Sequence, residues 1–205
     1  MFNDSRIARI SRFLKEKYNP SVLIVYGSFA AGNAGDHSDF DAMLLYGGAS
    51  LHDGSVVDGI PLDVFCYNAD TLEFHPENFV QVFDGHILVD THGVGKRMQQ
   101  QVMDYIQHTP KKSPQELDTE VGWCEKMLLR TRRQDAEGFF RWHWLLTDSL
   151  MIYYDILGEY YFGPKKSILK MQQRDPNAYS LYARALQQFD QPSLEEWIHF
   201  LRNML

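Results

Sequence analysis

The spacing of apolar side chains changes along the chain and predicts different elements in different segments. From residue 5 to residue 17, apolar positions recur three and four residues apart, at Ile7, Ile10, Phe13 and Leu14. This spacing predicts an amphipathic helix over residues 5–17, which the pair Asn19-Pro20 ends. The run VLIVYG, residues 22–27, is rich in β-branched side chains and predicts a buried strand that stops at Gly27.

Two further strands are predicted from patterns that contain acids. The segment DFDAMLLY, residues 39–46, begins with two aspartates and then becomes apolar, and Gly47-Gly48 closes it. Within residues 56–67, a turn at Asp58-Gly59 precedes a strand with alternating side chains. Its apolar set is Leu62, Val64 and Cys66, and its other set is Asp63, Phe65 and Tyr67.

The first half of the chain closes with one more strand and a helix. The segment GHILVDT, residues 85–91, predicts the strand, and residues 93–109 carry the helical pattern. Pro110 and the pair Lys111-Lys112 follow, and we interpret them as a linker.

Beyond the linker, every pattern is helical. Ser113-Pro114-Gln115-Glu116 combines an N-cap, a first-turn proline and a capping-box glutamate, so a helix is expected from there to about Arg133. Further helices are predicted over residues 135–158, 164–173, 177–189 and 193–204. We therefore expect an α+β fold, with a mixed, largely antiparallel sheet flanked by helices in residues 1–110 and an all-α bundle in residues 111–205.

Net charge and cysteine content indicate which classes of binding partner and which cellular compartment to expect. The 205 residues carry 27 acids against 20 bases, a formal net charge of −7, which opposes a nucleic-acid partner. Cys66 and Cys124 show no metal-type spacing and are interpreted as reduced core thiols. No apolar run approaches the ~20 residues of a membrane span, and the first residues lack a signal-peptide core, so a cytoplasmic protein without a membrane partner is expected.

The aspartates of the second strand are the strongest chemical signal. Residues two apart in a strand point to one face, so Asp39 and Asp41 present their carboxylates side by side, with backbones roughly 6 to 7 Å apart. Such a pair either raises one pKa or holds a cation, for which Mg²⁺ is the natural choice. Asp63 interrupts a later apolar strand that could lie beside the first pair, and three carboxylates can hold two Mg²⁺ ions for an in-line phosphoryl displacement.

Small residues before these acids are typical of a phosphate-binding turn. Gly27 permits close approach of the backbone to a ligand, and Ser28 can donate a hydrogen bond to phosphate. A short helix opening at Ala30 and Ala31 would add a favourable dipole. Each feature alone is more often a simple turn or a solvated strand end, and it is their order along the chain that favours a nucleotide site.

The stretches VYGSFAAGNAGDHSDFDAMLLY and IPLDVFCY resemble the signature of the DNA polymerase β-type nucleotidyltransferase superfamily. The size and the helical second half are similar to the small bacterial antibiotic nucleotidyltransferases of the kanamycin and lincosamide type. The resemblance covers residues 22–67 and implies a nucleotidyltransferase-type sheet in a catalytic domain, followed by a helical substrate-binding domain. It also implies transfer of a nucleoside monophosphate, usually AMP from ATP, to a hydroxyl of a small molecule such as an antibiotic, with release of pyrophosphate.

The same resemblance assigns roles to individual residues. Gly27 and Ser28 would contact the triphosphate, and Asp39 and Asp41 would ligate the two Mg²⁺ ions. Asp63 would be the third carboxylate, as a ligand of the catalytic metal or as a group that helps deprotonate the acceptor. Related antibiotic enzymes often form homodimers with the acceptor between subunits.

The helical half offers weaker candidates. Lys165 and Lys166 follow the Gly163-Pro164 break at a predicted helix start, where the dipole disfavours cations, so they are either solvated surface lysines or ligands of the triphosphate. The aromatic segment of residues 139–161 is interpreted mainly as bundle core, with cleft-lining roles open for Trp142, Trp144, Tyr153 and Tyr154. A base from this half could be His143, Glu120, Glu125 or Asp148, and no local motif selects one.

Two other functions remain open at this point. The chain could be a nucleotidyltransferase-fold interaction protein, for example a toxin–antitoxin component, although its long helical tail favours a substrate domain. A protein AMP-transferase lies between that reading and a small-molecule enzyme.

Overall fold

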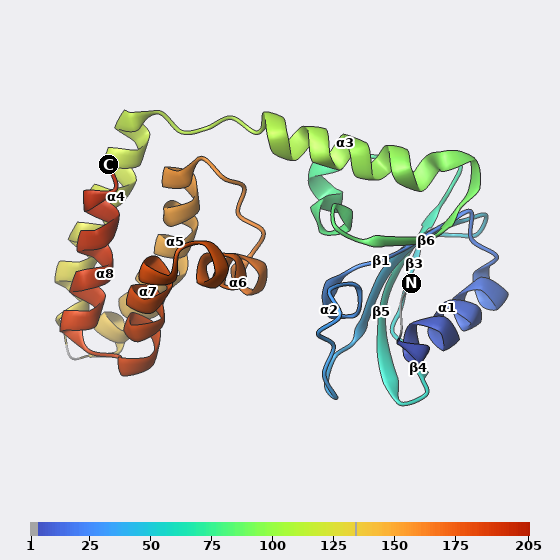
Figure 1. The fold of residues 1–205 in the computed structure, drawn as a ribbon, viewed down its shortest axis with the longest axis horizontal. Coiled ribbons are helices and arrows are strands. Elements are labelled where there is room, and N and C mark those ends of the chain that lie inside the picture. The colour runs from blue at the N-terminus through green and yellow to red at the C-terminus, as the bar shows by residue number, and fades with distance from the viewer. Residues whose placement is uncertain (1–3, 134) are drawn as a thin grey trace. The chain divides into compact units, whose positions relative to one another are not determined.

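The computed structural model describes residues 4–133 and 135–205, and the chain divides into two compact units, Met1–His108 and Thr109–Leu205. We call them the sheet unit and the helical unit. Figure 1 shows strands and helices in the first and helices alone in the second. The predicted α+β class, a mixed sheet flanked by helices and followed by a helical region, is confirmed.

The strands of the sheet unit lie in the order β3-β5-β2-β1-β6, with β4 pairing β5 off this path. Their bounds are β1 Val22–Val25, β2 Phe40–Tyr46, β3 Leu51–Asp53, β4 Val56–Val57, β5 Ile60–Asn68 and β6 His86–Asp90. β2 and β5 run parallel, and the other pairs are antiparallel. The long connection between the parallel pair contains β3 and β4, which return along β5 as its antiparallel partners.

Alternation along the strands divides the buried side chains between two cores. Phe40, Ala42 and Leu44 pack with α1, Ser5–Tyr18, in one cluster. Met43 and Leu45 pack in another cluster with α3, Val94–His108, and with the 3₁₀ segment Pro76–Val82. Because successive side chains of a strand point to opposite faces, each residue of β2 has its face fixed by its neighbours.

Local chemistry sets the ends of α1. The Asp4 carboxylate accepts from the backbone N–H of Arg6 at the N-terminus. At the other end Asn19 is left-handed, with φ 45°, and its N–H donates to the Lys15 carbonyl. The predicted stop at Asn19-Pro20 is therefore confirmed, in a conformation that asparagine adopts more readily than most residues.

The sequence analysis missed some elements of the sheet unit. The strand β3 was not predicted, since its three residues have no apolar alternation and it exists because β5 pairs with it. The 3₁₀ segments Pro76–Val82 and Thr91–Gly93 were also missed. The short helix expected to open at Ala30 and Ala31 is instead α2, Gly27–Ala30, so that expectation was wrong: the helix starts at Gly27, with Tyr26 between it and β1.

The helical unit contains five α-helices within its described residues. They are α4 Pro114–Thr131, α5 Ala136–Leu157, α6 Pro164–Arg174, α7 Pro176–Gln188 and α8 Gln191–Asn203. The predicted capping box is confirmed: the Ser113 hydroxyl accepts from the Glu116 N–H at 3.3 Å, and the Glu116 carboxylate accepts from the Ser113 N–H at 2.7 Å. Among residues 4–133 and 135–205, no helix combines the length and apolar character that crossing a bilayer requires.

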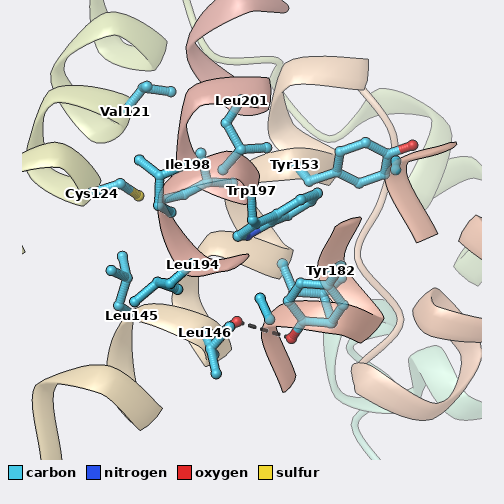
Figure 2. Close-up of a cluster of buried hydrophobic side chains, with 14 of the residues drawn as sticks. Val121, Cys124, Leu145, Leu146, Tyr153, Tyr182, Leu194, Trp197, Ile198 and Leu201 are labelled. Atoms are coloured by element: carbon cyan, nitrogen blue, oxygen red, sulfur yellow. Dashed lines mark hydrogen bonds between the residues drawn. The ribbon is translucent and has the colours of Figure 1, made fainter. Parts of the chain in front are cut away.

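The core of the helical unit surrounds the fully buried Trp197 (Figure 2). Its indole N–H donates to the Ser149 hydroxyl at 2.9 Å, and the Tyr182 hydroxyl donates to the Leu146 carbonyl at 2.9 Å. The core interpretation is confirmed for three aromatics of α5, which are Trp142, Tyr153 and Tyr154. Trp144 is 42% exposed and lies outside this core, and the cleft-lining role left open for it stays a prediction.

Both cysteines are buried and form no disulfide. Burial raises the pKa of the Cys66 thiol to about 11 and that of Cys124 to about 12, which keeps both protonated at neutral pH. The interpretation of both as reduced core thiols is therefore confirmed.

Candidate metal centre

Three carboxylates meet at the start of the parallel strand pair. Asp41 lies directly opposite Asp63 in the β2–β5 register, and Asp39 precedes β2 by one residue. One carboxylate oxygen from each of the three lies within 4.8 Å of the other two. Asp39 is exposed, while Asp41 and Asp63 are half-buried, so the cluster is open to solvent on one side.

The strand pattern explains why these acids converge. Phe40 and Ala42 are buried against α1, so the pleat turns Asp41 to the opposite face. On β5, Leu62 and Val64 fill the same α1 core and turn Asp63 to the face that Asp41 occupies. A shift of one residue in the β2–β5 register would separate the two acids.

Tyr26, at the end of β1, lies next to this cluster and was not singled out by the sequence. It is 7% exposed, and its backbone N–H donates to the Asp41 carbonyl at 3.0 Å. Burial raises the pKa of the Tyr26 phenol, and the negative charges of Asp41 and Asp63 raise it further. The phenol therefore stays neutral, and a buried, uncharged side chain lies beside the acids.

Gly27 has almost no space around its α-carbon. A Cβ atom built at this position would lie 2.0 Å from Oδ2 of Asp41, and the residue has φ 68°, which favours glycine. The first turn of α2 thus passes directly over one of the acids, and the buried Ser28 follows in the same turn. The close neighbour of Gly27 in the structure is the Asp41 carboxylate, and the expected approach of its backbone to a ligand stays a prediction.

His52 of β3 is a second residue that sequence analysis missed. Its Nε2 lies 2.6 Å from Oδ1 of Asp63, and its ring packs against Phe65 with the centroids 4.8 Å apart. The only local signals near it were the Asp-Gly dipeptides at 53–54 and 58–59, which mark turns. Those turns indicate a hairpin but do not reveal which residue of β5 faces His52.

A different carboxylate, Asp53, holds β3 in place. Its Oδ2 accepts from Lys17 Nζ at 2.8 Å and from the Tyr18 hydroxyl at 2.7 Å, and its Oδ1 accepts from the Ser55 N–H at 3.0 Å. Burial alone would raise the pKa of Asp53, but the hydrogen bonds from Lys17, Ser55 and Tyr18 outweigh it and hold the pKa well below its usual range. These bonds link the end of α1 to the strand that carries His52.

Lys165 and Lys166 are the nucleotide contacts that the sequence predicted in the helical half of the chain. Lys165 and Lys166 occupy the first turn of α6, after Gly163, and Lys165 is exposed. The location at a helix start is confirmed, and a role in nucleotide binding stays a prediction.

Two of the candidate bases of the helical half form ion pairs. Glu120 pairs with Lys112, which also contacts Asp155 at 2.8 Å. Glu125 pairs with Arg202 at 2.7 Å. The fold thus gives both acids a structural partner, which weighs against their use as a base.

The chemistry of the cluster suits a hard divalent cation. All three groups offer carboxylate oxygens, the ligands that Mg²⁺ and Mn²⁺ prefer, with none of the sulfur or imidazole ligands of a typical structural zinc site. Its open side leaves room for a further oxygen ligand such as a phosphate. The residues therefore fit the metal that the sequence led us to expect.

Comparison with known proteins finds a distant similarity in structure. No protein-family model and no curated protein matches the chain. Among solved structures, the chain is similar to a nucleotidyltransferase-like protein from Exiguobacterium sibiricum, with 10% sequence identity and a TM-score of 0.43, over 98% of this chain and 74% of that chain. The chemistry of the site rests on its own residues.

Proposed function

We propose that this chain is a metal-dependent nucleotidyltransferase that transfers a nucleoside monophosphate, AMP from ATP in the first instance, to the hydroxyl of a small molecule. The observation that carries the proposal is the convergence of Asp39, Asp41 and Asp63 within 4.8 Å. Three like charges held this close together cost stability, and a bound cation offsets that cost.

In the proposed reaction, the acceptor oxygen forms a bond to the α-phosphorus of the nucleotide. The bond from that phosphorus to the bridging oxygen of pyrophosphate breaks, and the hydroxyl proton passes to a base. Mg²⁺ held by the three aspartates would supply charge neutralisation for the phosphates and the attacking oxygen. Asp63 has two roles open to it, metal ligand and acceptor of the hydroxyl proton.

Other residues of the sheet unit support this chemistry by shaping the site. Gly27 lets the first turn of α2 approach the acids, and Ser28, the next residue of that turn, is the proposed phosphate contact. The buried, neutral side chain of Tyr26 lowers the local dielectric constant beside the acids. This strengthens the electrostatic attraction between the acids and a cation. In the helical unit, Lys165 and Lys166 are the proposed contacts for the triphosphate, and this unit would receive the acceptor.

A screen of pyrophosphate release tests the proposal. The purified chain is incubated with Mg²⁺, with ATP, CTP, GTP or UTP, and with a panel of hydroxylated acceptors that includes aminoglycosides and lincosamides. Asp39→Asn and Asp41→Asn should each lower the rate by about 100-fold or more, because each removes a charged ligand. Asp104→Asn, an exposed acid on α3, serves as the matched control and should keep the wild-type rate.

Circular dichroism of each variant checks that the fold is intact. Undiminished turnover in Asp39→Asn or Asp41→Asn would remove the metal assignment. Failure of every nucleotide and acceptor, in a wild-type protein that does not bind Mg²⁺, would remove the enzyme assignment.

One observation favours a second candidate, an interaction protein. Near the start of α5 the helical unit exposes several aromatic side chains, which are Phe139, Phe140 and Trp144, with Phe189 stacked on Phe139. Exposed aromatics that gather on one surface are typical of a protein contact. Stoichiometric recovery of one protein partner, together with no modification of any acceptor, would favour this function, and loss of that partner in Phe140→Ser would locate the contact.

A further inference from the structure

The imidazole of His52 is held between two residues of β5. In the antiparallel β3–β5 register, His52 lies opposite Phe65, and residues 63 and 65 of β5 point to the same face. The ring therefore packs on Phe65 at 4.8 Å while its Nε2 reaches Asp63 Oδ1 at 2.6 Å. Both contacts arise from one register, so the pairing of β3 with β5 fixes the imidazole.

The hydrogen bond has a defined direction. An ionised carboxylate can only accept hydrogen bonds, so Nε2 of His52 is the donor and Oδ1 of Asp63 the acceptor. One oxygen of Asp63 is thereby engaged on the β3 side. Its other oxygen takes no part in this bond.

Without this bond, Asp63 would have reason to turn away. The negative charge of Asp41, directly across the strand pair, repels it, and an aspartate side chain has two rotatable bonds that allow it to move toward solvent. Asp63 is half-buried and open on one side, so packing alone does not hold it. The bond from His52 opposes that rotation.

We propose that His52 is a positioning residue of the metal centre: its Nε2–H holds the Asp63 carboxylate in the orientation in which the three aspartates converge. The inference rests on the proposed function, since it assigns a supporting group to the same site. Groups that hydrogen-bond to metal-binding carboxylates commonly change metal affinity by about 10- to 100-fold.

The placement of His52 depends in turn on Asp53. The Asp53 carboxylate anchors β3 to Lys17 and Tyr18 at the end of α1, and His52 is the adjacent residue of that short strand. The buried acid thus fixes the backbone from which the imidazole extends. This arrangement gives a three-residue strand the rigidity that a positioning group needs.

Binding of Mn²⁺ without nucleotide tests the role, with the free ion measured by its electron paramagnetic resonance signal. His52→Phe keeps an aromatic ring against Phe65 and removes the donor, and it should weaken Mn²⁺ binding by about tenfold or more. His52→Gln restores an N–H donor and should recover most of the affinity. His75→Ala removes the imidazole of an exposed histidine that lies 3.9 Å from Glu77, and as the matched control it should bind Mn²⁺ like wild type.

A second readout separates positioning from loss of fold. Under pyrophosphate-release conditions, His52→Phe should raise the Mg²⁺ concentration for half-maximal rate, with a much smaller change in the rate at saturating Mg²⁺. Urea unfolding should give all three variants a stability close to wild type, because His52 is exposed.

The outcomes distinguish the inference from the function on which it rests. Wild-type Mn²⁺ affinity in His52→Phe, or weak binding that His52→Gln does not restore, overturns the inference and leaves the metal centre standing. Mn²⁺ binding that is absent in the wild type, or that Asp41→Asn does not weaken, overturns the metal centre and the inference together.

Discussion

Asp53 and Asp63 lie on neighbouring strands of one sheet, and their surroundings differ. Asp53 is 6% exposed and accepts from Lys17, Tyr18 and Ser55, so its charge is balanced within the chain. Asp63 is half-buried and faces Asp41 and Asp39, whose charges have the same sign. The first arrangement stabilises the fold, whereas the second costs stability.

This difference indicates which acid serves structure and which serves function. A carboxylate whose hydrogen bonds come from a lysine, a tyrosine and a backbone amide has a sufficient structural reason to be there. Three carboxylates held within 4.8 Å of one another repel, and clusters of this kind are expected where a ligand compensates the repulsion. Four changes test the contrast.

Removing the Asp53 carboxylate should have the largest effect on stability. Asp53→Ala deletes an acceptor of hydrogen bonds from α1 and from the Ser55 amide, so the free energy of unfolding should fall by about 3 kcal/mol. Urea unfolding measures this loss. Asp104→Ala, at an exposed position of α3, is the control and should stay within about 0.5 kcal/mol of wild type.

The Asp53 contribution should also depend on pH. The folded-state pKa lies below the unfolded value of about 3.9, so the contribution is fully present above that value and is lost as the pH falls toward the folded pKa. The difference in unfolding free energy between wild type and Asp53→Ala should therefore be constant from about pH 5 to 7 and shrink below about pH 4. A difference that grows on acidification would contradict this account.

Crowding at Gly27 should have a smaller, two-part effect. Gly27→Ala meets both a positive φ and the carboxylate of Asp41, while Gly32→Ala has a similar φ of 71° with no atom within 4 Å. We expect the free energy of unfolding to fall by about 1 kcal/mol in Gly32→Ala and by about 2 kcal/mol in Gly27→Ala. Only Gly27→Ala should lose Mg²⁺ binding. Equal losses in the two variants, with Mg²⁺ binding retained, would show that Gly27 does not shape the site.

The smallest change is expected for Asp41→Asn in the absence of metal. Removing one of three like charges should leave stability unchanged or raise it by up to about 1 kcal/mol. Added Mg²⁺ should raise the melting temperature of the wild type but not that of Asp41→Asn. A clear loss of stability in metal-free Asp41→Asn would make this acid structural, like Asp53.

Much of the local structure was predictable because neighbouring residues determine it. The capping box at Ser113 and Glu116 marked the start of α4, and the Asn19-Pro20 pair marked the end of α1. The alternation of Leu62, Val64 and Cys66 correctly placed the buried face of β5. These signals are short-range, since caps, turns and strand alternation act within a few residues.

The candidate site was predictable only in part, for the same reason. The spacing of Asp39 and Asp41 indicated two carboxylates on one face, because that follows from the strand repeat alone. That Asp63 lies opposite Asp41 depends on β2 pairing with β5 in one parallel register, which no local pattern specifies. The contact of His52 with Asp63 and the crowding of Gly27 against Asp41 depend on that pairing and on the strand neighbours it creates.

The sequence by itself therefore determined the elements, their faces and the kinds of acid available, since each follows from the side chains of adjacent residues. Only the tertiary structure decided which acids converge, which histidine hydrogen-bonds to one of them, and which acid has its charge balanced by donors within the chain. These contacts depend on the pairing of elements that are distant along the chain.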